Sequence, residues 1–93
     1  MLYPVTAKNV VFADVFYTMF ENTFYAGYEF LGEKHNFWEM FYVMDGRATV
    51  NADGRVYNMG KDEVIFHKPM EFHKFNVEED NTKCFIMTFE LKG

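Results

Sequence analysis

The chain has 93 residues, enough for about one domain, which excludes two-domain enzymes and large α/β folds. Its composition is 49% hydrophobic and 20% aromatic, so the chain can bury a core and is not disordered. Nine basic residues against fourteen acidic ones give a net charge of -5, which excludes the basic surface expected of a nucleic-acid-binding domain.

Few features of the sequence indicate a cellular compartment. The single cysteine, Cys84, cannot form an internal disulfide, and no cysteine pair has zinc-binding spacing. The N-terminus lacks the basic and apolar regions of a signal peptide, and no apolar run approaches the ~20 residues of a membrane span. We therefore expect one cytoplasmic domain over residues 1–93, without contact to a membrane.

Short runs of β-forming residues, separated by turn residues, predict an all-β chain. In chain order, the expected strands are 10–20, 24–31, 38–44, 47–51, 55–59, 63–66, 72–78 and 83–91. The first is the weakest, since its apolar residues also fit a helical stripe, and no other segment resembles a helix. Asp45-Gly46 and Asp53-Gly54 mark hairpin turns, because both pairs tolerate positive φ. This spacing predicts a barrel or sandwich of about eight antiparallel strands.

Strand alternation indicates which residues face the barrel interior, because alternate side chains lie on one face. In the strand that opens at His73, the inward set is His73, Phe75 and Val77. Around the first predicted hairpin, the inward set is Glu33, His35, Glu39, Phe41 and Val43. In the last strand we expect Phe85, Met87, Phe89 and Leu91 inside, with Thr88 and Glu90 outside and Cys84 as an ordinary strand residue.

Two histidines and one or two carboxylates entering one pocket from different strands have the donor types of a divalent-metal site with open positions. Three roles stay open for His35 and His73: a hydrogen-bonded structural role, contact with an organic ligand, and metal ligation. Glu39 needs a partner in any of them, because a buried carboxylate without one is costly. His67 stands beside Lys68 and Pro69, is expected to be exposed, and is left out of the site.

The spacing of these residues resembles a known pair of motifs. Gly27, five residues, Glu33-Lys34-His35, three residues, Glu39, six residues and Gly46 resemble the first motif of the cupins, a glycine followed by His-x-His, Glu and glycine. Pro69-Met70-Glu71-Phe72-His73 resembles the second motif, with Asp62-Glu63 where Gly-Asp is usual. The resemblance covers about half of the chain and implies a double-stranded β-helix.

Within the cupins, residues 35–46 and 64–73 are similar to the N-terminal sensor domain of AraC-type transcriptional regulators. That resemblance implies a small-molecule effector, such as a sugar or related metabolite, contacting His35, Glu39, His73, Phe41 and Phe75. It also implies that DNA is contacted only through a C-terminal helix-turn-helix domain, which is not in these 93 residues. The chain is therefore expected to be a sensor domain or a stand-alone cupin.

The alternative is a small metal-dependent enzyme of isomerase or dioxygenase type, with Fe, Mn, Ni or Zn held by Glu33, His35, Glu39 and His73. Glu33 replaces the first histidine of the motif, which makes the donor set harder and more negative. No nucleophilic triad or phosphate loop is present, and no catalytic residue is assigned.

The aromatic residues are divided by parity. Seven of them could line a cavity or fill the core: Phe30, Phe37, Trp38, Tyr42, Phe66, Phe75 and Phe85. Trp38 and Tyr42 have the parity opposite to Glu39, so they are expected on the outer face of the barrel together with Met40 and Met44. An exposed aromatic face of this kind favours homodimerisation.

Overall fold

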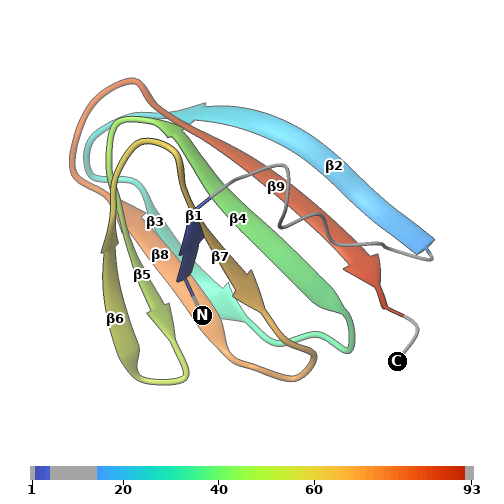
Figure 1. The fold of residues 1–93 in the computed structure, drawn as a ribbon. Coiled ribbons are helices and arrows are strands. Elements are labelled where there is room, and N and C mark those ends of the chain that lie inside the picture. The colour runs from blue at the N-terminus through green and yellow to red at the C-terminus, as the bar shows by residue number, and fades with distance from the viewer. Residues whose placement is uncertain (1, 5–14, 92–93) are drawn as a thin grey trace.

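The computed structural model describes residues 2–4 and 15–91 and folds them into nine strands in two antiparallel sheets (Figure 1). The strands are β1 (Leu2–Pro4), β2 (Val15–Phe24), β3 (Glu29–Glu33), β4 (Trp38–Asp45), β5 (Ala48–Ala52), β6 (Arg55–Met59), β7 (Glu63–His67), β8 (His73–Val77) and β9 (Thr82–Glu90). One sheet has the order β1-β7-β4-β9-β2 and the other β3-β8-β5-β6. The described residues contain no helix, and the predicted all-β fold is confirmed.

Most predicted strands are confirmed, and 55–59 has the predicted bounds. The prediction of one strand over 24–31 is wrong, because Phe24 ends β2 and a turn separates it from β3. The Tyr28 N–H closes this turn by donating to the Tyr25 carbonyl at 3.1 Å, and Gly27 takes a φ of +91°. The segment expected over 10–20 is a strand from Val15 onward, and its residues 10–14 lie outside the described part of the chain.

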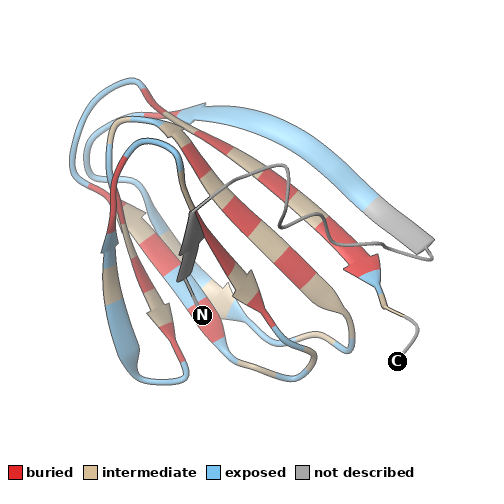
Figure 2. Cartoon of the chain, viewed as in Figure 1, coloured by how far each residue is buried: buried red, intermediate tan, exposed pale blue. Residues whose placement is uncertain are grey.

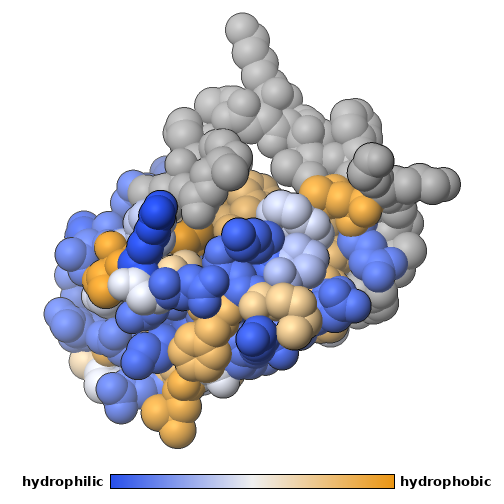
Figure 3. All heavy atoms as spheres, turned by 90° about the horizontal axis from the view of Figure 1, so that it is seen from below, coloured by the Kyte–Doolittle hydropathy of each residue, from blue (hydrophilic) through white to orange (hydrophobic). Residues whose placement is uncertain are grey.

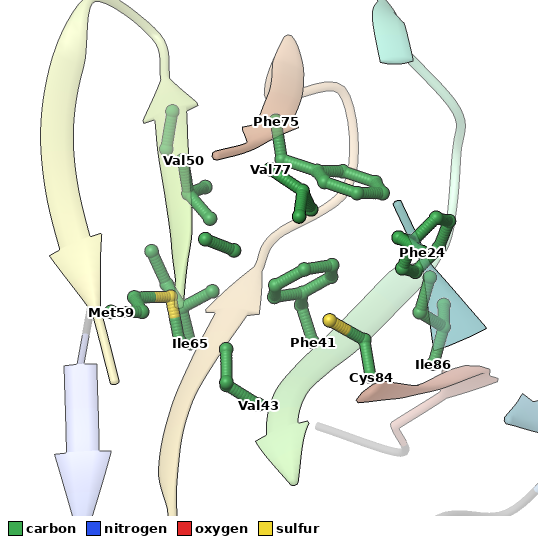
Figure 4. Packing of buried hydrophobic residues seen from close by; sticks show 12 residues of the cluster. Phe24, Phe41, Val43, Val50, Met59, Ile65, Phe75, Val77, Cys84 and Ile86 are labelled. Atoms are coloured by element: carbon green, nitrogen blue, oxygen red, sulfur yellow. The ribbon is translucent and has the colours of Figure 1, made fainter. Parts of the chain in front are cut away.

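The core lies between the two sheets (Figure 4). On β4 the side chains of Phe41 and Val43 point inward and are 1% and 0% exposed, as the alternation predicts. The buried and half-buried residues alternate along β4, β5 and most of β9 (Figure 2). Phe75 and Val77 on β8 are also buried, as predicted.

The predicted inner face of β9 is wrong. Its even residues face the core, since Ile86 is the register partner of inward-facing Phe41 and Cys84 that of Val43. Thr88 is buried on the same face, and Phe85 is only half-buried on the other one. Phe89 is fully buried, but its ring packs with Trp38 and Phe66 on the outer side of the sheet. Neighbouring strands therefore fix which face is inner, because the apolar residues of β9 alone occupy both faces.

The predicted hairpin between β5 and β6 is confirmed, whereas the hairpin predicted at Asp45-Gly46 is wrong, because β4 and β5 lie in different sheets. Asp53 and Gly54 take φ values of +51° and +88°, which a two-residue hairpin turn requires of both positions. Asn51 supports the turn, since its side-chain oxygen accepts from the Gly54 N–H at 2.9 Å.

Polar and charged residues cover most of the face seen in Figure 3, and apolar side chains appear there in small groups. Among the described residues, no helix has the length and apolar character to cross a membrane.

Candidate metal centre

A row of polar side chains crosses the inner face of the five-stranded sheet. Glu39 on β4 is the register partner of His67 on β7 and of Thr88 on β9. Thr88 is in turn the partner of Thr18 on β2, and their hydroxyl oxygens share a hydrogen bond of 2.6 Å. Antiparallel pairing therefore brings polar groups from four strands to one level of an otherwise apolar interior.

The opposite sheet supplies Glu33 and His73, which are register partners on β3 and β8. The β3 register shifts between Phe30 and Glu33, where Gly32 takes a φ of +115°. Such a bulge adds one residue to a strand and changes the parity of its inner face. Phe30, an even position, lines the same interior as the odd position Glu33 for this reason.

His35 lies in the loop between β3 and β4 and is held by three contacts. Its Nδ1 is 2.9 Å from the Phe37 carbonyl, and its ring stacks on the Phe37 ring at 4.0 Å between centroids. Its own carbonyl accepts from the Met70 N–H at 2.7 Å, which joins this loop to the one between β7 and β8. These contacts direct Nε2 toward the polar row.

Four of the side chains predicted for the site meet there. His35 Nε2 lies 3.3 Å from Glu39 Oε1 and 3.4 Å from Glu33 Oε1. His73 Nε2 lies 3.3 Å from Glu39 Oε2 and 3.3 Å from Glu33 Oε1. The side chains of Glu39 and His73 are buried, that of His35 is 12% exposed, and that of Glu33 is 45% exposed. The cluster is thus buried on one side and open on the side of Glu33.

Backbone contacts determine which nitrogen of each imidazole faces the cluster. His73 Nδ1 lies 3.0 Å from the Glu71 carbonyl, as His35 Nδ1 does from that of Phe37. A carbonyl can only accept, so both Nδ1 atoms carry hydrogen and both Nε2 atoms are directed at carboxylates. Each Nε2 then needs a proton or a cation between it and the carboxylates. A backbone carbonyl that fixes the orientation of a histidine in this way is typical of metal ligands.

Electrostatics couple Glu39 to His73. Burial alone would raise the pKa of Glu39, but the hydrogen bond and charge of His73, with smaller contributions from His67 and His35, outweigh burial and lower it. Burial would likewise lower the pKa of His73, but the hydrogen bond and charge of Glu39, with the Glu71 carbonyl and Glu33, raise it. The pocket therefore favours the ionised carboxylate beside a positive charge.

The prediction that His67 is exposed is wrong. Its side chain is buried at 1% exposure, and its ring stacks on His73 with centroids 4.2 Å apart and planes at 7°. Its Nδ1 is 3.2 Å from Glu71 Oε1. Burial, helped by the charge of His73, lowers the pKa of His67 to about 4 against the charges of Glu39 and Glu71. The signal that could have found it is parity, since His67 alternates with the buried Ile65 on β7.

A cavity of about 480 Å³ opens beside the cluster, within the range of small-molecule sites of about 300–1,000 Å³. The lining residues come from β2, β3, β4, β8, β9 and the segments that flank β3: Thr18, Phe20, Asn22, Phe24, Tyr28, Phe30, Glu33, His35, Phe37, Glu39, Phe75, Ile86 and Thr88. Phe75 is in this set, whereas Phe41 lies buried against it with ring centroids 4.7 Å apart. Trp38 and Tyr42 are outside it, half-buried on the outer face of β4.

The four clustered side chains fit a divalent ion. One ligand atom from each of Glu33, His35, Glu39 and His73 can be chosen so that all four lie within 4.8 Å of one another. In octahedral coordination, ligand bonds of about 2.1 Å place adjacent donor atoms about 3 Å apart and opposite ones about 4.2 Å apart. Shifts of a few tenths of an ångström in the side chains would therefore suffice. Two imidazole nitrogens and two carboxylate oxygens suit Fe, Mn, Ni or Zn.

One family of known proteins matches the part of the chain that holds the cluster. The sequence model of the Cupin domain matches residues 23–89, which include every residue of the cluster. No curated protein matches the sequence significantly.

Solved structures resemble the fold at low identity. A predicted oxalate decarboxylase from Thermotoga maritima has a TM-score of 0.77 and 15% identity, over 82% of this chain and 68% of that one. KdgF from Halomonas sp. has a TM-score of 0.70 and 14% identity, over 75% of this chain and 64% of that one. An RmlC-like cupin from Shewanella frigidimarina has a TM-score of 0.69 and 19% identity, over 80% of this chain and 67% of that one. The chain thus spans about two thirds of these proteins, and the likeness shows a shared fold.

Proposed function

The chain belongs to the cupin family, and from that premise we propose that it binds a divalent metal ion at Glu33, His35, Glu39 and His73 and a small organic ligand in the adjoining cavity. The observation that carries the proposal is the opposition of two backbone-oriented Nε2 atoms to two carboxylates within 3.3–3.4 Å. An ion would take the place of the protons that this arrangement otherwise requires, and the site would stay neutral.

Each side chain has a distinct task in this proposal. Glu39 is buried and uses both oxygens, one toward each histidine, so it is the central donor. Glu33 is half exposed at the opening, so it can shift as ligand enters. A divalent ion held here would polarise an oxygen of the ligand as a Lewis acid. The aromatic side chains of the lining would contact the part of the ligand that lies beyond the ion.

A second candidate is the effector-binding domain of an AraC-type regulator without metal. It is favoured by the hydrogen bonding of the cluster, because every buried polar side-chain atom among the described residues has a partner without an ion. The effector would occupy the same cavity and act through different affinities for two arrangements of the protein. Its signal would pass to a DNA-binding domain outside this chain.

Metal analysis of protein purified without chelator separates the two. About one Fe, Mn, Ni or Zn ion per chain, lost in Glu39→Gln but kept in the exposed-surface variant Glu90→Gln, supports the metal cupin. If the protein is metal-free, does not take up these ions from solution and is stabilised on heating by a metabolite, the proposal fails in favour of the sensor. A metal-loaded protein leaves the isomerase or dioxygenase chemistry to be assayed on the bound ligand.

Homodimerisation through the outer face of β4 stays a prediction. Trp38 stacks on Phe89, and the Tyr42 hydroxyl donates to Asp62 at 2.9 Å, so both side chains are partly engaged within the chain. Tyr42→Arg keeps a partner for Asp62 and places a charge on this face. A change from dimer to monomer in sedimentation is expected, and a wild-type protein that sediments as a monomer would contradict the prediction.

A further inference from the structure

The side chains that line the cavity include no lysine or arginine. Two glutamates, Glu33 and Glu39, are among them. With a divalent ion balancing Glu33 and Glu39, the site is neutral, and one negative charge on a ligand can be met at the ion. A second charge placed against the buried Phe24, Phe75 and Ile86 would lose water without gaining a cationic partner, which is costly. The lining therefore selects against dianions and phosphates.

Polar and aromatic linings lie at different levels of the cavity. Along the inner face of β2, the lining residues run from Thr18 through Phe20 and Asn22 to Phe24. The register partner of Thr18 is Thr88, which lies beside Glu39, so this end adjoins the metal centre. The Phe24 end lies farther along β2, where the chain turns toward β3.

The far end is built from aromatic rings. Phe24 lies 4.6 Å from Tyr28 and 5.4 Å from Phe75, measured between ring centroids. Phe30 adds a further ring 5.7 Å from Phe75. Phe24, Phe75 and Ile86 come from three different strands and lie around one apolar space (Figure 4). A flat apolar group gains both burial and ring contacts there.

From these observations we infer that the ligand is a singly charged 2-oxo or 2-hydroxy carboxylate with an aromatic side chain. The inference rests on the proposed metal centre, which takes the oxygen-rich head of the ligand. The Thr18 and Thr88 hydroxyls share one hydrogen bond and keep one further hydrogen to donate, which suits a carboxylate oxygen. The aromatic side chain of the ligand packs against Phe24, Tyr28 and Phe75, which line the far end of the cavity.

Three probes with one head group and different tails test this inference by calorimetry on the metal-loaded full chain. Phenylpyruvate has an aromatic tail, pyruvate lacks it, and 2-oxoglutarate has a carboxylate in its place. We expect phenylpyruvate to bind roughly tenfold more tightly, or better, than either of the others. Equal or tighter binding of pyruvate or 2-oxoglutarate, or no binding of any probe to metal-loaded protein, overturns the inference and leaves the metal centre standing. Failure to load metal is the separate failure of the proposed function.

Variants of the lining residues test which end of the cavity holds the head of the ligand and which holds its tail. Asn22→Lys places a cation on the lining, and we expect it to strengthen 2-oxoglutarate binding about tenfold without helping pyruvate. The double variant T18V/T88V removes both hydroxyls without leaving either unpaired and should weaken all three probes roughly tenfold. Thr49→Val, whose hydroxyl donates to Asn58 outside this cavity, is the matched control and should change nothing. Unchanged affinities in T18V/T88V overturn the assignment of the carboxylate head to this end of the cavity. An Asn22→Lys protein that binds 2-oxoglutarate no more tightly than the wild type overturns the assignment of the tail.

Discussion

The imidazole rings of His67 and His73 lie parallel, with centroids 4.2 Å apart and planes at 7°. One of them belongs to the clustered ligand set, and the other is buried behind it at the end of β7. Because burial lowers the pKa of His67 to about 4, the rear ring is neutral at physiological pH. A neutral stacked ring supports His73 without adding a positive charge beside the proposed metal centre.

Removal of the His67 ring should leave His73 less firmly held, because the two rings stack. We expect His67→Ala to lower metal affinity about tenfold, in the range seen for residues that orient ligands, and to destabilise the fold by about 2 kcal/mol. Isothermal titration with the metal ion and urea unfolding measure the two effects. Lys68→Ala, at the exposed neighbouring position, is the control and should leave both values unchanged. Wild-type metal affinity in His67→Ala would contradict a positioning role.

Acid should destabilise the metal-free protein partly through His67. In the folded protein the pKa of His67 is about 4, below its ordinary value of 6.5. Between these two pH values the unfolded state therefore binds more protons than the folded state. Stability is therefore expected to fall as pH is lowered from about 6.5 to about 4, by up to about 3 kcal/mol from this group. Urea unfolding across this window should show a shallower pH dependence for His67→Gln, which keeps a donor for Glu71. Equal slopes in both proteins would refute the assignment.

Metal affinity should depend on pH through His73. Glu39 and the neighbouring acceptors overcome the effect of burial and raise the pKa of His73, so a proton competes with the ion. We expect affinity to fall about tenfold per pH unit for each proton displaced as pH is lowered through that raised pKa. Titrations between about pH 6 and about pH 8 measure the slope. An affinity independent of pH would mean that the ion binds elsewhere.

Two glycines with positive φ, Gly46 between the two sheets and Gly54 in the β5–β6 hairpin, offer a test of the fold. Gly46 has a φ of +81°, and a Cβ there would lie 2.8 Å from Thr82 Cα, whereas Gly54 has a φ of +88° and open space. Both alanine variants carry the positive-φ cost of about 1–2 kcal/mol, and Gly46→Ala carries a backbone clash as well. Unfolding measurements should therefore show Gly46→Ala to be less stable than Gly54→Ala by at least about 1 kcal/mol. Equal stabilities would argue against the close approach of Gly46 to Thr82.

The sequence is most informative where one strand alternates cleanly. Glu39 and Phe41 alternate with half-buried residues on β4, so parity was enough to place them on the inner face. It is least informative on β9, where Phe85 and Ile86 are both apolar and only pairing with β4 decides which faces the core. The bulge at Gly32 is likewise a property of two strands, because it exists only relative to β8.

The clustering of Glu33, His35, Glu39 and His73 was predictable from the sequence, but the surroundings of the cluster were not. The motif spacing predicted that His35 and His73 lie close together, and in the structure their ring centroids are 4.9 Å apart. His67 was missed because Lys68 and Pro69 predict an exposed turn, although β7 extends to His67 before the chain turns. Thr88 was placed outside because its own strand has apolar residues on both sides, while its pairing with Glu39 puts it inside.

The two carboxylates should differ in importance for metal binding. Glu39 is buried and contacts both histidines through separate oxygens, whereas the Glu33 side chain is 45% exposed. We expect Glu39→Gln to reduce metal affinity at least about a hundredfold and Glu33→Gln only about tenfold. Isothermal titration of both variants beside Glu90→Gln gives the comparison. The reverse order would show that the exposed carboxylate is the dominant ligand.

A crystal structure of the protein soaked with Mn²⁺ or Zn²⁺, recorded at the absorption edge of the metal, tests the central claim most directly. The account predicts one anomalous peak per chain, within about 2.0–2.3 Å of His35 Nε2, His73 Nε2 and an oxygen of each of Glu33 and Glu39. A metal peak away from these four side chains, or an unaltered cluster without a peak at saturating metal, would contradict it.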